Sequence, residues 1–211
     1  MPCTSRSAAL AVLIAIPSTA TAKPVTQAIN FTVERKGSDI GTYSVRFSRN
    51  TDGLQVTSRM NLKVRLLGVP VYSYRYDSTE VWRDNELNAL TVSVNDNGKR
   101  SFVKGERNGG AFAWNNGSRN YAATGNIFPS NHWNDNVLHQ RRVLNTLTGK
   151  LNNVSIRRAG TDRLNCSFGT VNATRYVYSG QLKTEAWYTA SGRWVGLRFK
   201  AEDGSDIMFK C

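Results

Sequence analysis

One stretch of the chain, Val71 to Arg83, places aromatic and acidic residues at every second position. Side chains of a β-strand alternate between two faces, so a strand here puts one set together: Tyr72, Tyr74, Tyr76, Ser78, Glu80 and Trp82. The opposite face is mostly polar, with Arg75 and Asp77 among its members. The aromatic face is therefore predicted to point inward, with Glu80 among the rings.

The chemistry open to Glu80 depends on what surrounds it. A buried carboxylate needs a hydrogen bond or a cation, because burial otherwise raises its pKa. Glu80 could orient a ligand in a pocket. It could equally belong to an internal ion pair or cap backbone amides, and Tyr-rich strands are more often core than binding site. Both interpretations stay open at this point.

The two histidines, His132 and His139, lie seven residues apart with Asp135 between them. In a helix, spacings of three and four residues would put all three on one face. A metal site needs a further ligand that is not in view, so we expect no metal and treat these side chains as solvated or capping. His132, beside Trp133, is placed instead near the mouth of a cavity.

Motifs of familiar enzyme classes are missing from the sequence. It contains no Gly-x-Ser-x-Gly, no His-Glu-x-x-His, no Cys-x-x-Cys and no phosphate-binding glycine loop. We expect no catalytic residues, no cofactor and a protein that is not an enzyme. One catalytic hypothesis is kept, in which Glu80 and His132 act as acid and base on a common substrate atom.

The elements that would position these residues are mainly β-strands. Apolar and polar residues alternate along most of the chain and are interrupted by turn dipeptides such as Asn97-Gly98. About eleven strands are predicted, and their short connections favour antiparallel pairing in sequence order. Only Ser130 to Lys150 breaks this pattern, with Asn131 or Asn134 as a helix cap.

A sheet of that size tends to curl or close. The predicted fold class is therefore mainly β: an antiparallel meander curled into an open or half barrel. One short helical segment would act as a lid over an apolar concave face.

The first 22 residues have the layout of a secretory signal peptide. Arg6 precedes an apolar run from Ser7 to Ile16, and Ala20-Thr21-Ala22 offers small residues for cleavage after Ala22. The remaining residues 23–211 contain no linker or repeat and are expected to form a single β-barrel-like domain. Since the apolar run falls short of the roughly 20 residues that span a bilayer, we expect a periplasmic or secreted protein without a transmembrane segment.

Two cysteines, Cys166 and Cys211, would remain after cleavage. An even number in an oxidising compartment predicts a disulfide. Two separate thiols are the alternative. Closing a loop of this length would stabilise the fold by about 4 kcal/mol in the loop-entropy view.

The charge balance is strongly basic, with 28 Lys and Arg against 15 Asp and Glu, a net charge of +13. For an exported protein this favours lipid or another anionic envelope component over nucleic acid. It could equally serve solubility alone. Arg59, Lys63 and Arg65 share one strand face and form a candidate basic surface, while the oligomeric state is left open.

Several short motifs occur in an order that is familiar. They include Thr79 to Asp84 (TEVWRD), Pro129 to Asn134 (PSNHWN), Asp203-Gly204-Ser205 and the terminal cysteine. The sequence resembles a bacterial secreted family known as domain of unknown function 6134, over about Phe31 to Phe209. The resemblance implies a Gram-negative envelope protein with an antiparallel β fold. More loosely, this is similar to the open barrels of lipoprotein carriers, and the family supplies no activity and no catalytic residues.

The leading hypothesis is a periplasmic or secreted binding or carrier module for an amphipathic, anionic, lipid-like ligand. The candidate ligand-binding residues are Tyr72, Tyr74, Tyr76, Glu80, Trp82, His132 and Trp133. The alternatives are an envelope scaffold or interaction protein, with a filled core and a basic outer surface, and an atypical enzyme.

Overall fold

A computed structural model describes residues 28–51 and 53–211. The predicted signal peptide and its cleavage site at Ala22 lie outside these residues. The strands are β1 (Ala28–Arg35), β2 (Ser38–Asn50), β3 (Gly53–Leu66), β4 (Val69–Arg83), β5 (Glu86–Asp96), β6 (Lys99–Asn108), β7 (Ala111–Asn115), β8 (Asn120–Thr124), β9 (Arg142–Leu144), β10 (Leu151–Cys166), β11 (Gly169–Gly180), β12 (Thr184–Tyr188), β13 (Trp194–Lys200) and β14 (Asp206–Lys210).

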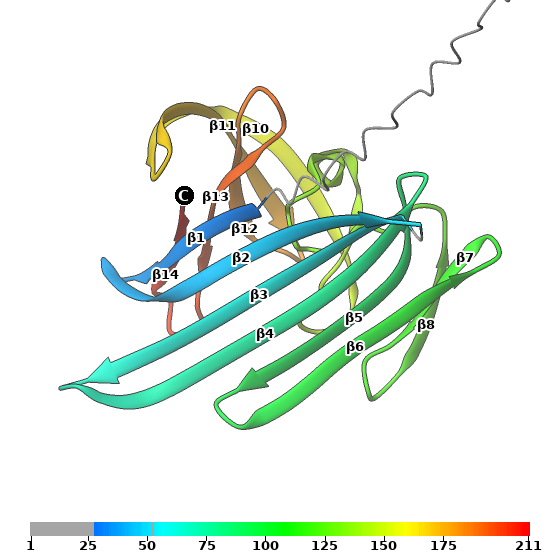
Figure 1. Ribbon diagram of the computed structural model, residues 1–211, viewed down its shortest axis with the longest axis horizontal. Helices are drawn as coiled ribbons and strands as arrows, with labels where there is room; N and C mark the ends of the chain where they lie inside the picture. Colours follow the sequence, from blue (N-terminus) through cyan, green and yellow to red (C-terminus); the bar gives the residue numbers. More distant parts are fainter. Residues whose placement is uncertain (1–27, 52) are drawn as a thin grey trace, which may run out of the picture.

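All of these strands belong to one antiparallel sheet that curls but does not close (Figure 1). The strand order is β8-β7-β6-β5-β4-β3-β2-β1-β14-β13-β12-β11-β10-β9. Consecutive strands pair as predicted, but β1 pairs with β14, so the first and last described strands meet in the middle of the sheet. Strands β8 and β9 form its two edges.

The hairpin turns and β-bulges explain the curvature. Asn97 and Gly98, at φ values of 48° and 95°, make the left-handed turn between β5 and β6 that suits the twist of the flanking strands. Register shifts interrupt five of the strand pairs. Each such shift bends a strand and increases its twist, so the long hairpins roll around a common interior.

The main core lies on the concave face of the sheet. Val33, Val45, Val56 and Leu90 are fully buried there, each at an inward position of its strand. In β4 the residues from Tyr76 to Trp82 alternate between buried and half-buried. The predicted inward direction of the aromatic face of β4 is therefore correct.

Fourteen strands form within residues 28–51 and 53–211, so the prediction of about eleven is too low. The three strands that were missed are β1, β8 and β9. Both edge strands are short: β8 has few β-formers, and β9 spans only Arg142–Leu144. Such segments gain strand structure from the neighbour they pair with, which local alternation does not reveal.

The predicted helical lid is wrong. In the described residues there is no α-helix, and the only helical turn is the 3-10 helix η1 (Asp135–His139). Residues 125–150, here called the crossing segment, instead run irregularly across the concave face between β8 and β10. His132 has a φ of 59°, which interrupts any helix, while Pro129 and Leu144 form an isolated bridge.

The second half of the sheet carries a small second cluster of buried side chains. Trp187 and Val195 point away from the main core and form a small cluster with Ala173. Close by, the sulfur atoms of Cys166 and Cys211 lie at disulfide distance, with their Cα atoms 4.6 Å apart. The β10–β11 hairpin is thus tied to the end of β14, as the cysteine count predicts.

Within the residues described, no helix has the length and apolar character that crossing a membrane would require.

Candidate functional site

Glu80 lies at the centre of a buried hydrogen-bond network. Its side chain is fully buried, and its Oε2 accepts hydrogen bonds from the indole nitrogens of Trp82 at 2.7 Å and Trp133 at 2.9 Å. The amide nitrogen of Asn131 donates to Oε1. Burial raises the pKa of the Glu80 carboxyl above its usual range, and these three donors offset part of that rise.

The network continues from Asn131 along the concave face. The Tyr76 hydroxyl donates to Asn131 Oδ1 at 2.5 Å and lies 3.1 Å from Thr146 Oγ1. Asn131 Nδ2 is also 3.2 Å from Ser78 Oγ, and Thr146 Oγ1 is 3.2 Å from Ser130 Oγ. Because every member has a partner, the network ties the crossing segment firmly to β4.

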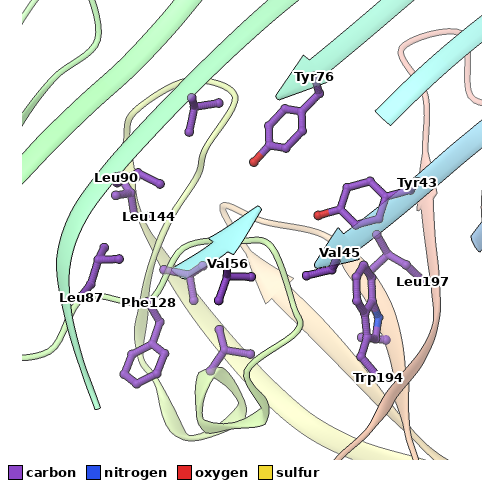
Figure 2. Close-up of a cluster of buried hydrophobic side chains, with 14 of the residues drawn as sticks. Tyr43, Val45, Val56, Tyr76, Leu87, Leu90, Phe128, Leu144, Trp194 and Leu197 are labelled. Atoms are coloured by element: carbon purple, nitrogen blue, oxygen red, sulfur yellow. The ribbon is translucent and has the colours of Figure 1, made fainter. Parts of the chain in front are cut away.

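On the other side of Tyr76 the interior is hollow. A cavity of about 270 Å³ lies between the crossing segment, the β11–β12 connection and strands β2, β3, β4, β12, β13 and β14. Its walls are mainly apolar and include the side chains of Tyr43, Met60, Tyr76, Leu182, Trp194, Leu197, Phe199 and Phe209. Figure 2 shows the rings of Tyr43 and Tyr76 side by side, with Trp194 and Leu197 next to Tyr43.

Two lysines line the same cavity and are exposed, so they mark its mouth. Lys200 Nζ is 2.9 Å from Asp206 Oδ1. Lys183 is exposed, and no acidic group in the described part of the chain forms an ion pair with it. With respect to the described residues, Lys183 is therefore a cation at the mouth that is available to an anionic group.

His132 is the most unusual polar residue of the cavity wall. It is only 5% exposed, its ring lies 5.7 Å from that of Trp194 and 5.3 Å from that of Tyr178, and its Nδ1 has no hydrogen-bond partner among the described residues. Burial lowers the pKa of His132 to about 4. The Tyr188 hydroxyl donates to its backbone oxygen at 2.8 Å, which holds the left-handed backbone in place.

The predicted ligand-binding residues do not form one site. Tyr76 and His132 line the cavity, whereas Glu80, Trp82 and Trp133 form the adjoining network. The two indoles also border a polar hollow of about 370 Å³ on the far side, together with Asp84 and Asp135. Tyr72 and Tyr74 lie half-buried farther along β4, toward the β3–β4 turn.

The predicted common face of His132, Asp135 and His139 is wrong. His132 precedes η1 and is buried, while His139 ends η1 and is exposed. Among the residues described, no three His, Cys, Asp or Glu side chains are grouped as they would be around a metal ion. Glu80 does not line the cavity that His132 lines, so the two share no space for a substrate there.

Sequence reasoning missed Asn131, Thr146, Tyr43 and Trp194. Tyr43 and Trp194 carried a usable signal, since both lie at apolar positions of alternating strands. Asn131 and Thr146 carried none, because their partners on β4 are more than 50 residues away in the chain.

The candidate basic surface lies on the outside of β3. Arg59, Lys63 and Arg65 are all exposed. Arg59 Nε is 3.5 Å from Asp77 Oδ1, and the Arg65 guanidinium donates to the backbone oxygen of Gly68 at 3.2 Å.

These features define a β-barrel-like protein, with an open curled sheet around a partly hollow interior. The chain belongs to the family described as domain of unknown function 6134 (DUF6134), which residues 31–211 match. The resemblance noted from the motifs is thus confirmed.

Comparison with solved structures supports the same architecture. The chain is similar to a crystal structure from Brucella abortus described as a beta-barrel-like protein of domain of unknown function DUF1849. The TM-score is 0.59 at 10% identity, over 89% of this chain and 96% of the other. No curated protein matches the sequence. A likeness at this identity shows the fold alone.

Proposed function

We propose that this protein is a binding or carrier module of the bacterial envelope for an amphipathic ligand with an apolar body and an anionic head. The observation that carries the proposal is the cavity beneath the crossing segment, with its apolar walls and its lysine-bearing mouth. The beta-barrel-like fold is consistent with this role.

The size of the cavity limits the ligand. Small-molecule sites have volumes of roughly 300–1,000 Å³, so a cavity of about 270 Å³ suits a single acyl chain or a small ring system. A lipid with several chains would be too large. The apolar body would lie against Leu197, Phe199 and Phe209, because transfer of apolar surface from water to these walls is favourable.

Two polar features would orient the ligand. Lys183 at the mouth would attract a carboxylate or phosphate head. Inside, the unpartnered Nδ1 of His132 offers a hydrogen bond to a polar group of the ligand, which would remove the cost of leaving that nitrogen buried without a partner. Few polar groups in a mainly apolar pocket are typical of small-molecule sites.

Export to the envelope is part of the proposal. It rests on the signal-peptide layout of the first 22 residues and on the pairing of Cys166 with Cys211, which an oxidising compartment favours.

The first test is binding of a fluorescent fatty acid to the full chain purified after export, with native mass spectrometry of the same sample for retained ligand. Leu182→Trp should fill the cavity and weaken probe binding at least tenfold. Leu164→Trp is the matched control, because Leu164 lines a separate hollow beside Trp187 and Cys211; it should bind as the parent does. A parent protein that purifies empty and binds no acyl probe would overturn the proposal.

The second test concerns the head group. Lys183→Glu should weaken a carboxylate probe several-fold and leave the corresponding fatty alcohol unaffected. Equal effects on both probes would show that Lys183 does not select the anionic head.

A further inference from the structure

The tip of the β3–β4 hairpin projects beyond the rest of the sheet. Strand β2 pairs with β3 only as far as Leu62, and β5 pairs with β4 only as far as Tyr74. The last backbone hydrogen bond from the β5–β6 hairpin runs from Asn97 N to Ser73 O at 2.8 Å. Residues 63–72, here called the arm, therefore pair only with each other, and Figure 1 shows them extending past the neighbouring turns.

The arm carries an unusual share of exposed apolar surface. Leu67 is 97% exposed, Val69 62% and Val71 52%. Of the six large apolar side chains that are exposed in the described residues, three lie in the arm. Soluble proteins rarely gather such side chains in one place unless the patch binds something.

The charge of the arm is of one sign. It contains Lys63 and Arg65 and no acidic residue, and both cations are exposed. The hydrogen bond from Arg65 to the backbone oxygen of Gly68 holds its guanidinium at the turn. Exposed Leu67 and Val69 at the tip, with Lys63 and Arg65 on the adjoining end of β3, match the two layers of an anionic lipid surface, an acyl boundary beneath a layer of phosphates.

A protein partner that adds a strand fits the arm less well. Pro70 has no backbone N–H, so one edge of the arm lacks a donor where a partner strand would need it. An isolated two-stranded hairpin is also only marginally stable in water, so insertion of its tip into a membrane interface would stabilise it.

We infer that the arm docks this protein on an anionic lipid bilayer, with Leu67, Val69 and Val71 entering the interface and Lys63 and Arg65 against the phosphates. The docking site is separate from the cavity and holds whether or not the cavity takes a ligand. The net charge of +13 adds a long-range attraction toward the same surface.

The test is co-sedimentation of the full chain with vesicles of phosphatidylglycerol and phosphatidylethanolamine, compared with phosphatidylcholine alone. The parent should partition onto the anionic vesicles at least tenfold more strongly. The triple variant Leu67→Ser, Val69→Thr, Val71→Thr should lose at least tenfold, and Lys63→Gln with Arg65→Gln should lose several-fold and weaken the salt dependence.

Matched control variants remove exposed apolar side chains and exposed cations outside the arm. Phe102→Thr with Phe168→Thr removes exposed rings outside the arm, and Lys150→Gln with Arg157→Gln removes two exposed cations. Both should bind vesicles within about twofold of the parent, and the arm variants should still bind the acyl probe. Parent protein that stays off anionic vesicles, or arm variants that bind like the parent, would overturn the inference; in the first case a protein partner replaces the lipid.

Discussion

Two adjoining parts of the interior, here called the Glu80 end and the His132 end, differ sharply although strand β4 runs through both. At the Glu80 end, each oxygen of the carboxylate has a donor and the space is filled by the indoles of Trp82 and Trp133. At the His132 end, a buried ring nitrogen has no partner in the described part of the chain, and a cavity of about 270 Å³ remains. The first arrangement is what a stable core requires, and the second is typical of a site that awaits a ligand.

The crossing segment creates this difference over three consecutive residues. Asn131 and Trp133 donate to Glu80, whereas His132 between them lines the cavity and packs against Trp194. The positive φ of His132 turns the backbone at this point. A single chain crossing thus completes one end of the interior and leaves the other open.

The largest expected effect comes from breaking the filled end. Glu80→Ala would leave two indole N–H groups and one amide N–H buried without an acceptor, so the free energy of unfolding should fall by about 4 kcal/mol. Urea denaturation followed by tryptophan fluorescence measures it. Glu80→Gln keeps an acceptor oxygen and should lose clearly less; equal losses would mean that the hydrogen bonds at Glu80 contribute little.

The next expected effect is a pH dependence of the free energy of unfolding, which arises at the His132 end. Well above pH 6.5, His132 is neutral in both the folded and the unfolded chain, so its titration does not affect stability there. As the pH falls toward about 4, His132 binds a proton in the unfolded chain, but in the folded chain burial keeps it largely neutral. The free energy of unfolding should therefore drop by about 3 kcal/mol at pH 4.

His132→Asn is the variant that isolates the contribution of His132 protonation to stability. Asn tolerates a positive φ, so the backbone should be retained while the titrating group is removed. Denaturation of both proteins at pH 7 and pH 4 should show a smaller acid loss in the variant. Parallel losses would place the acid sensitivity elsewhere.

The smallest expected effect concerns Tyr76, which lines the cavity and also donates a hydrogen bond to the Glu80 network. Tyr76→Phe removes the donor to Asn131 Oδ1 and should cost about 1.5 kcal/mol, because that oxygen stays buried. Binding of the acyl probe should change less than twofold, since the ring still lines the cavity. Tyr74→Phe, on the same face of the same strand, is the control and should lower the free energy of unfolding less. An equal loss would mean that the hydrogen bond from Tyr76 to Asn131 does not stabilise the fold.

Local patterns in the sequence predicted much of this structure. Alternation at every second position located most strands and the inward face of β4, because the direction of a side chain in a strand is a local property of the backbone. The count of cysteines predicted the pair Cys166 and Cys211. Burial of Glu80 among rings followed from the same alternation.

Other features depended on residues far apart in the chain. The pairing of β1 with β14 and the shortness of the edge strands follow from how the sheet curls. The helix predicted over Ser130 to Lys150 failed because its polar groups bind the sheet: Asn131 bonds to Glu80 and Tyr76, and β9 pairs with β10.

The sequence by itself thus determined which residues face inward, where the chain turns, and that the protein is strongly basic. Only the tertiary structure decided which inward residues meet, and therefore that Glu80 is enclosed by donors while His132 borders an empty space. The physical reason is that alternation records the two faces of a strand, whereas the volume between a curled sheet and the segment crossing it depends on the packing of all of them together.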